Sequence, residues 1–228
     1  MAVLDRVDES MELESLVRPC VRDLSAYLPG KPIAEVQREL GVRRVVKLAS
    51  NENPLGPSPK AMAAARRSLA ECHLYPEGAS PILRQALARR LGISQERILV
   101  SNGSDEAIRL LCEAFLSPGD PAVVSQYGFI RFKQQALLMG ARLVEVPMKN
   151  WKHDLGAMGR AARYGAKLLF VASPNNPTGT YNTRDELETI LYGVPASTRR
   201  PHFDRLPRGW ARTAWPATWS GAGASPTW

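Results

Sequence analysis

Two asparagines stand in a proline-containing loop, Ser173–Gly179, that directly follows the apolar run Lys167–Ala172. The apolar run predicts a buried parallel strand, and Pro174 and Pro177 prevent it from continuing as strand or helix. Because the prolines remove most of the loop's freedom, the Asn176 amide is expected to be held at the carboxyl end of the strand. Open α/β sheets bind their ligands at that end. The alternative is a rigid connector without chemistry.

A second candidate is the turn Ser101–Glu106, between a predicted strand, Ile98–Val100, and a predicted helix, Ala107–Phe115. The first amides of a helix have no intrahelical partners, and the helix dipole favours an anion there. The backbone amides of Ser104 and Asp105 therefore form a candidate phosphate cradle. The alternative is a well-capped helix, in which these two side chains satisfy the amides themselves.

The elements that position these groups alternate between strand and helix patterns over residues 98–191. The predicted strands are 98–100, 122–124, 142–146 and 167–172. Helices are expected from about 130 to Met139 and over 155–164, and the capping box Thr183–Glu186 begins a helix to about Leu191. This alternation predicts a mainly parallel, doubly wound α/β sheet with flanking helices. Core packing explains Phe129, just after the second strand, better than a ligand does.

Residues 30–97 predict short helices separated by turns. The expected helices are Ile33–Leu40, ended by Gly41, then residues 60–69, then residues 81–91, capped by Ser80 and closed by Gly92. Asn53 lies in the run Ser50–Gly56, which a capping loop would also explain. Tyr75 precedes Pro76, and taken alone that pair is an ordinary turn.

Composition excludes several classes of protein. Half of the net charge of +8 comes from residues 197–228, which hold five arginines and one aspartate, and the other half is spread thinly along the chain. This distribution does not favour nucleic-acid binding. No apolar run approaches the roughly 20 residues of a membrane span. The acidic N-terminus predicts no secretory signal. Three widely spaced cysteines fit neither a disulfide framework nor a zinc site, so no metal is expected and the predicted compartment is the reducing cytoplasm.

Taken together, the motifs resemble those of aminotransferases dependent on pyridoxal phosphate (PLP), and most of all histidinol-phosphate aminotransferase. The resemblance covers residues 24–195. Its motifs are Tyr27–Pro32, Ser50–Gly56, Tyr75–Pro76, Gly103–Glu106 and the Asn-Pro-Thr-Gly loop. It implies a PLP-dependent transferase fold of the aspartate-aminotransferase type, a homodimer, and amino-group transfer between glutamate and imidazole acetol phosphate in histidine biosynthesis.

The resemblance also implies a role for each matching residue. The Ser104 and Asp105 amides bind the cofactor phosphate, the Tyr127 ring stacks on the pyridine, and Asn176 hydrogen-bonds the phenolic oxygen. Tyr75 reaches the phosphate in the other subunit. Tyr27 and Asn53 are expected to contact the substrate, a small molecule. An aromatic aminotransferase and a phosphothreonine decarboxylase share these motifs and stay open, as does a non-catalytic fragment.

No lysine follows Lys167, so this sequence contains no candidate for the Schiff-base lysine and no catalytic residue is assigned. Residues 1–45 are expected to form an N-terminal arm and small-domain segment, and residues 46–195 an incomplete PLP-binding large domain. Residues 196–228 hold four of the five tryptophans among arginines and prolines without any helical or strand period. We interpret them as an aberrant, disordered tail, with a shifted reading frame as the hypothesis.

Overall fold

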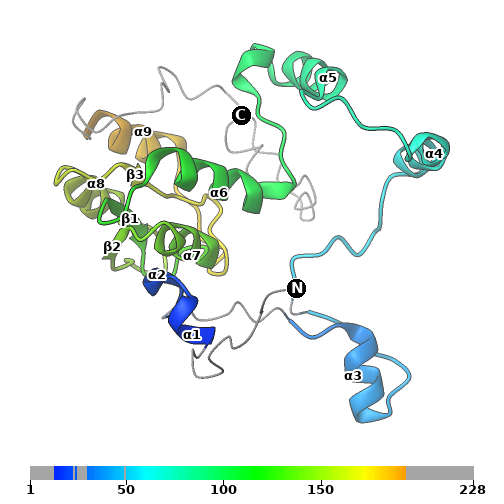
Figure 1. Ribbon diagram of the computed structural model, residues 1–228, viewed down its shortest axis with the longest axis horizontal. Helices are drawn as coiled ribbons and strands as arrows, with labels where there is room; N and C mark the ends of the chain where they lie inside the picture. The colour runs from blue at the N-terminus through cyan, green and yellow to red at the C-terminus, as the bar shows by residue number, and fades with distance from the viewer. Residues whose placement is uncertain (1–12, 23, 25–29, 49, 194–228) are drawn as a thin grey trace, which may run out of the picture. The chain divides into compact units, whose positions relative to one another are not determined.

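The computed structural model describes residues 13–22, 24, 30–48 and 50–193 (Figure 1). The chain divides into two compact units, the first made of residues 1–26 and 101–204 and the second of residues 27–100 and 205–228. Tyr27 and the predicted tail from residue 196 lie outside the described residues. The domain boundaries expected near residues 45 and 195 stay a prediction.

A parallel sheet forms the centre of the first unit, with three strands in the order β2-β1-β3 among the described residues. The strands are β1 (Pro121–Ser125), β2 (Arg142–Val146) and β3 (Leu168–Leu169). Residues 122–124 of the central strand are at most 1 % exposed. Such a run of small and β-branched apolar side chains suits a parallel strand that is covered on both faces.

Helices cover both faces of this sheet (Figure 1). They are α6 (Gly103–Phe115), α7 (Ile130–Leu138), α8 (Leu155–Ala162) and α9 (Arg184–Gly193). Ala122 and Val124 point into a core shared with α6 and α7. Val123, on the opposite face of the strand, belongs to a second core shared with α8 and α9. The predicted fold class, a parallel α/β sheet with flanking helices, is confirmed.

The connections reverse direction at the central strand. From β1 the chain passes through α7 to β2 on one side, and from β2 it passes through α8 to β3 on the other side of β1. In a right-handed crossover, the direction in which the chain moves across the sheet decides which face the connecting helix covers. The two crossovers run in opposite directions, so α7 and α8 cover opposite faces. The reversal creates a topological switch point between the carboxyl ends of β1 and β3.

Two short helices near the N-terminus join the same unit, α1 (Leu13–Leu16) and α2 (Pro19–Arg22). Between them, the Arg18 guanidinium donates a hydrogen bond of 2.9 Å to the carbonyl of Leu138, the last residue of α7. The Cys20 thiol lies 3.6 Å from the same oxygen. These donors satisfy a carbonyl that has no partner within its own helix.

Three sequence predictions for the first unit need correction. The segment Ile98–Val100 is not a strand: it is unpaired, and Leu99 is 66 % exposed. The helix expected from Ala107 begins at Gly103, because Ser, Asp and Glu are good first-turn residues as well as turn formers. The strand expected over residues 167–172 is reduced to β3, since only β1 lies beside it in the described chain.

The second unit contains the helices α3 (Ile33–Leu40), α4 (Pro59–Ser68) and α5 (Pro81–Leu91), with the short 3₁₀ turns η1 (Leu69–Glu71) and η2 (Gln95–Arg97). Gly41 and Gly92 end α3 and α5 in the left-handed conformation, as predicted. Ser80 precedes α5, but its side chain makes no capping hydrogen bond, so its predicted capping role is wrong.

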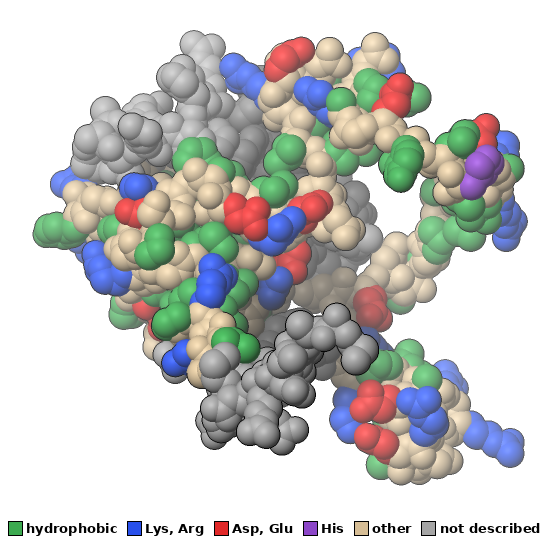
Figure 2. Space-filling model, viewed as in Figure 1, with side chains coloured by type: hydrophobic (Ala, Val, Ile, Leu, Met, Phe, Trp, Pro, Cys, Tyr) green, Lys and Arg blue, Asp and Glu red, His purple; other side chains and the backbone are tan. Residues whose placement is uncertain are grey.

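None of the described residues between 30 and 100 is buried. Apolar side chains of this unit lie at the surface instead, among them Ile82, 81 % exposed, and Leu69, 66 % exposed (Figure 2). Within the described ranges, no helix is long and apolar enough to cross a membrane, and no group of three or more His, Cys, Asp or Glu residues could hold a metal ion.

Candidate cofactor site

The switch point brings two predicted site residues to the same edge of the sheet. Tyr127 follows β1 by two residues, and Asn176 lies in the loop after β3. The amide nitrogen of Asn175 donates a hydrogen bond of 3.0 Å to the Tyr127 carbonyl, which ties the two loops together. Ligands of open α/β sheets bind in the crevice that such diverging loops form. The structure therefore places Tyr127 and Asn176 where the sequence predicted them.

Asn175, the residue before Asn176, holds the Asn-Pro loop in place. Asn175 is only 3 % exposed, and its backbone N–H donates to the Thr180 carbonyl while its carbonyl accepts from Gly179, both at 2.8 Å. Its side-chain nitrogen also donates to the Thr178 hydroxyl at 2.8 Å. The Asn175 Oδ1 is buried without a hydrogen-bond partner in the described part of the chain. Asn176 itself is partly exposed.

The Tyr127 ring is 46 % exposed, so one part of it faces solvent and is open to a ligand. The Tyr127 ring also lies beside the ring of Trp151. The two ring centroids are 5.3 Å apart, and the two ring planes are inclined by 44°. Trp151 comes from the turn after β2, to which the sequence analysis assigned no role. A signal was present, because a tryptophan in a polar connector between two predicted elements is unusual.

The predicted phosphate cradle lies at the N-terminus of α6. Asn102 precedes the helix without a side-chain capping bond, and Gly103 has φ of 71° with open space where a Cβ would stand. The predicted alternative, in which Ser104 and Asp105 cap their own helix, is wrong, because the Asp105 carboxylate instead pairs with Arg131 of α7 at 2.6 Å. That ion pair joins the first turn of α6 to the first turn of α7, four residues after Tyr127.

These features fit an anion. The Ser104 and Asp105 amides lie in the first turn of α6, where the helix N-terminus favours an anion, and the Asn102 side chain does not cap this turn. Two carboxylates lie beside them: Asp105 pairs with Arg131, and Glu106 accepts a hydrogen bond of 2.5 Å from the Asn102 N–H. Both Ser104 and Asp105 belong to the helix and do not precede it, and their role in binding a phosphate stays a prediction.

A buried histidine lies beneath the same edge of the sheet and was missed by the sequence interpretation. His153 is 5 % exposed; its Nε2 lies 2.8 Å from the Ala172 carbonyl and its Nδ1 lies 2.6 Å from the Ser125 hydroxyl. A carbonyl can only accept, so Nε2 carries the proton and Nδ1 accepts from Ser125. Burial lowers the pKa of His153, which keeps the imidazole neutral.

The His153 bridge joins the last residue of β1 to the chain just beyond β3. Ser125 and Ala172 come immediately before the two loops that carry Tyr127 and Asn176. The imidazole therefore fixes the spacing of the strand ends at the switch point. No sequence period could have revealed this bridge, because its partners are 28 and 19 residues away from the histidine.

The last lysine of the sequence does not reach the site. Lys167 stands at the amino end of β3, where its ammonium pairs with Asp120 at 2.8 Å, just ahead of β1. That ion pair lowers the pKa of Asp120. The carboxyl ends of the strands lie at the opposite edge, so Lys167 cannot serve the switch point.

The other predicted contacts belong to the second unit. Tyr75 is fully exposed. The Asn53 side chain accepts from the Leu55 N–H and donates to the Gly56 carbonyl, both at 3.1 Å. Asn53 thus folds its own loop, as the capping-loop interpretation predicted, and its contact with substrate stays a prediction. The same holds for Tyr75, and Tyr27 lies outside the described residues.

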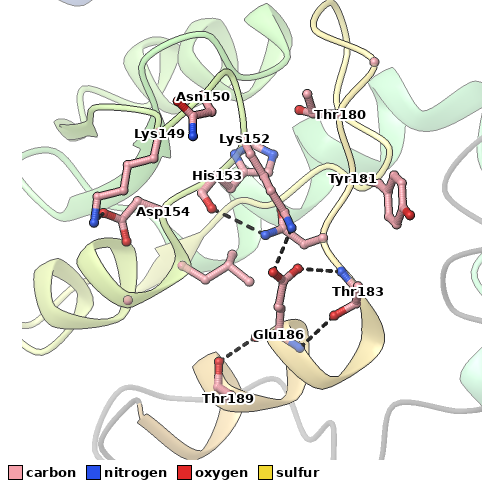
Figure 3. Close-up of a pocket in the computed structure, with 14 residues that line it drawn as sticks. Lys149, Asn150, Lys152, His153, Asp154, Thr180, Tyr181, Thr183, Glu186 and Thr189 are labelled. Atoms are coloured by element: carbon pink, nitrogen blue, oxygen red, sulfur yellow. Dashed lines mark hydrogen bonds and ion pairs between the residues drawn. The ribbon is translucent and has the colours of Figure 1, made fainter.

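A hollow of about 730 Å³ lies near the start of α9 (Figure 3). It is bordered by the segment after β2 and by the start of α9, and none of the predicted site residues lines it. Ion pairs stand along it, Lys149 with Asp154 at 2.8 Å and Lys152 with Glu186 at 2.7 Å. Lysine contacts lower the pKa of both carboxyl groups.

Glu186 also closes the predicted capping box at the start of α9. Its carboxylate accepts from the Thr183 N–H at 2.7 Å, and its own N–H donates to the Thr183 hydroxyl at 3.3 Å (Figure 3). These reciprocal bonds confirm the capping box. The lysines and carboxylates that border the hollow are therefore paired with one another.

Comparison with known proteins decides the family. The model of the aminotransferase class I and II family matches residues 43–205, well over half of the chain. This chain belongs to the class I and II aminotransferases. The histidinol-phosphate aminotransferase of Symbiobacterium thermophilum is 51 % identical over 184 residues, which are 81 % of this chain and 51 % of that protein. The enzyme of the same name from Moorella thermoacetica is 46 % identical over 180 residues, 79 % of this chain and 47 % of that protein.

Solved structures agree with this assignment. Histidinol-phosphate aminotransferase from Sinorhizobium meliloti, solved with pyridoxal 5'-phosphate, superposes with a TM-score of 0.71 at 27 % identity, over 80 % of this chain and 49 % of that one. Aspartate aminotransferase from Thermus thermophilus, with maleate, gives a TM-score of 0.62 at 29 % identity, over 70 % and 44 % of the two chains. The chain spans about half the length of the curated relatives that it matches.

Proposed function

We propose that this chain carries the PLP-binding loops of a histidinol-phosphate aminotransferase. That enzyme exchanges an amino group between glutamate and imidazole acetol phosphate in histidine biosynthesis. The observation that carries the proposal is the hydrogen bond from the Asn175 side chain to the Tyr127 backbone carbonyl, which joins the loops that carry Tyr127 and Asn176 at the switch point. The identity of 51 % to a histidinol-phosphate aminotransferase supports this substrate class over an aromatic aminotransferase or a phosphothreonine decarboxylase.

Each residue has a separate task in this proposal. The Ser104 and Asp105 amides bind the phosphate at the N-terminus of α6. The exposed part of the Tyr127 ring covers one face of the pyridine, and Asn176 donates to the phenolic oxygen. PLP, when bound, supplies an electron sink for the substrate's α-carbon. The protein's part is to orient the ring and hold the phosphate.

The remaining parts of the proposal concern assembly and compartment. The enzyme would act as a cytoplasmic homodimer, with Tyr75 reaching the phosphate site of the other subunit. The full exposure of Tyr75 supports this, because a tyrosine that contacts a partner must extend from its own subunit. Binding of nucleic acid or of membranes is not part of the proposal.

The first test measures binding without requiring a covalent lysine. Pyridoxamine 5'-phosphate is titrated against the 228-residue chain, with pyridoxamine, which lacks the phosphate, as the matched control. Charge-assisted bonds to the phosphate predict that the control binds about 10- to 100-fold more weakly. Tyr127→Leu, which removes ring stacking, is expected to weaken the phosphate compound about threefold to tenfold. Equal affinity of the two compounds would refute the cradle.

A second candidate function, a non-catalytic fragment, is favoured by one observation: the last lysine, Lys167, lies at the wrong edge of the sheet. The same preparation incubated with PLP and then reduced with borohydride separates the two possibilities. No single lysine is expected to carry a stoichiometric pyridoxyl group. A uniquely labelled lysine would show that the chain completes the covalent site by itself.

A further inference from the structure

The turn after β2 has an unusual backbone. Lys149 and Lys152 exchange backbone hydrogen bonds of 3.0 and 2.9 Å, and the two residues between them, Asn150 and Trp151, have φ of 50° and 62°. Asparagine tolerates this left-handed conformation, but it is unfavourable for a large aromatic residue. Glycine would normally occupy the second position of such a turn. The surroundings must therefore hold Trp151 in place.

Two contacts hold it. The Thr180 hydroxyl donates a hydrogen bond of 2.6 Å to the Trp151 carbonyl, and the Trp151 ring lies against the Tyr127 ring with centroids 5.3 Å apart. The first contact comes from the loop after β3 and the second from the loop after β1. Trp151 is 61 % exposed, so its ring is not there to fill a core.

The hydrogen bonds behind Trp151 have a defined direction. Because the Thr180 hydroxyl gives its only proton to Trp151, the contact of 2.8 Å between the Thr178 and Thr180 hydroxyls must be donated by Thr178. Thr178 in turn accepts from the Asn175 amide nitrogen, whose second proton goes to the Tyr127 carbonyl. The Thr178 and Thr180 hydroxyls thus each accept one hydrogen bond and donate another, an arrangement in which neighbouring bonds strengthen one another.

These contacts form a closed circuit. It runs from the Tyr127 backbone through Asn175, Thr178 and Thr180 to the Trp151 backbone, and it returns through the Trp151 and Tyr127 rings. The circuit joins the loops after all three strands of the sheet. Asn176, next to Asn175, is carried by the same circuit.

We propose that Trp151 and Thr180 are positioning residues, which hold the Tyr127 ring at a fixed place relative to Asn176 so that both meet the same cofactor ring. This proposal rests on the proposed function, because the cofactor gives the fixed spacing its use. The backbone strain at Trp151 fits the role, since strained residues persist where the surrounding structure over-determines them.

Hydrogen exchange tests the circuit without any cofactor. Thr180→Val keeps the shape of the side chain and removes the hydroxyl, whereas Thr180→Ser keeps the hydroxyl. Amides of residues 126–128 and 175–179 are expected to exchange about tenfold faster in the valine variant and near the parental rate in the serine variant. Unchanged exchange in the valine variant, with helix content retained by circular dichroism, would overturn the circuit.

The role of the ring is tested with Trp151→Gly, which suits the left-handed backbone and so relieves strain while it removes the ring. Melting temperature is expected to stay level or rise, while the affinity for pyridoxamine 5'-phosphate falls about fivefold; Trp151→Phe should restore most of the affinity. If Trp151 served stability alone, Trp151→Gly would lower the melting temperature and leave the affinity unchanged. Unchanged or tighter binding in the glycine variant would overturn the proposal, since the ring would then not support the Tyr127 position.

The two levels of failure can be told apart. If the parental chain binds no pyridoxamine 5'-phosphate, the proposed cofactor function fails, and the positioning role toward that cofactor falls with it. If the parent binds but the Trp151 and Thr180 variants bind equally well, only the positioning role fails. Support requires faster exchange in Thr180→Val together with weaker binding in Trp151→Gly.

Discussion

The two units of this chain have similar helix signals in their sequences and very different packing. In the first unit the central residues of β1 are at most 1 % exposed and two cores lie on opposite faces of the sheet. In the second unit α3 and α5 begin and end as their sequences predict and α4 is shifted by one residue, yet no described residue is buried. Local signals therefore suffice to place a helix, whereas burial depends on what else is present to pack against it.

The difference has an energetic meaning. A helix of about ten residues is marginal by itself, and tertiary packing of its apolar face supplies most of its stability. The first unit has that packing, since α8 places Leu155, Met158 and Ala162 in a core. The apolar side chains of α5 have no such partner in the described chain, and Ile82 and Leu83 are exposed.

The largest expected effect comes from placing the same charge in both units. Val123→Asp buries a carboxylate at a site that is 0 % exposed and is expected to cost more than about 4 kcal/mol, enough to unfold the first unit. Val46→Asp, at a site that is 72 % exposed, should change stability by less than about 0.5 kcal/mol. Thermal denaturation followed by circular dichroism measures both. Similar losses in the two variants would show that the second unit has a core after all.

A smaller effect is expected in native-state hydrogen exchange. Amides within α8, which contributes Met158 at 0 % exposure, should exchange at least about tenfold more slowly than amides within α5, where no residue is buried. Both helices contain the full set of intrahelical bonds, so a difference would reflect packing and not hydrogen bonding. Equal protection would contradict the comparison between the units. The measurement is mass spectrometry of peptides from residues 81–91 and 155–162.

Sequence patterns predicted what depends on neighbours in the chain. The strand Arg142–Val146 and the helix Ile33–Leu40 have the predicted limits, and the Thr183–Glu186 capping box forms as expected. Apolar runs, glycine stops and capping residues are local signals, so they can be read without knowing the fold. The predicted fold class followed from the alternation of these elements.

The failed predictions depend on distant partners. Ile98–Val100 has the composition of a strand, but a strand forms only when another strand lies beside it, and none does in the described chain. The His153 bridge joins residues 28 and 19 positions away. The Tyr127–Trp151 pair joins two loops that the sequence interpretation treated separately. For the site, the sequence predicted Tyr127 and Asn176 correctly as neighbours of strand ends but could not predict what holds them.

The smallest expected effect concerns pH and one histidine in each unit. Burial lowers the pKa of His153. Its imidazole therefore stays neutral in the folded state at pH values where the same histidine in the unfolded chain, with a pKa of about 6.5, already binds a proton. Between these two pKa values the unfolded state binds more protons, so the free energy of unfolding rises with pH. The stabilisation is complete above about pH 6.5 and is lost as pH falls from there through the folded pKa. Protonation would also remove the acceptor that Nδ1 offers to Ser125, which loosens the strand ends beneath the site.

Denaturant unfolding of the first unit at pH 5.0, 6.0, 7.0 and 8.0 is expected to show this slope. His153→Gln should lose the slope, whereas His73→Gln, at an exposed position in the second unit, should keep it. A flat response over this range, with stability lost only below pH 5.0, would instead point to carboxyl groups whose pKa is lowered by lysine contacts, namely Asp120, Asp154 and Glu186. If His153→Gln does not fold, an NMR titration of the His153 imidazole in the parental chain decides the matter. An imidazole that titrates at or above the ordinary histidine pKa would mean that the bridge at the switch point does not hold the neutral form.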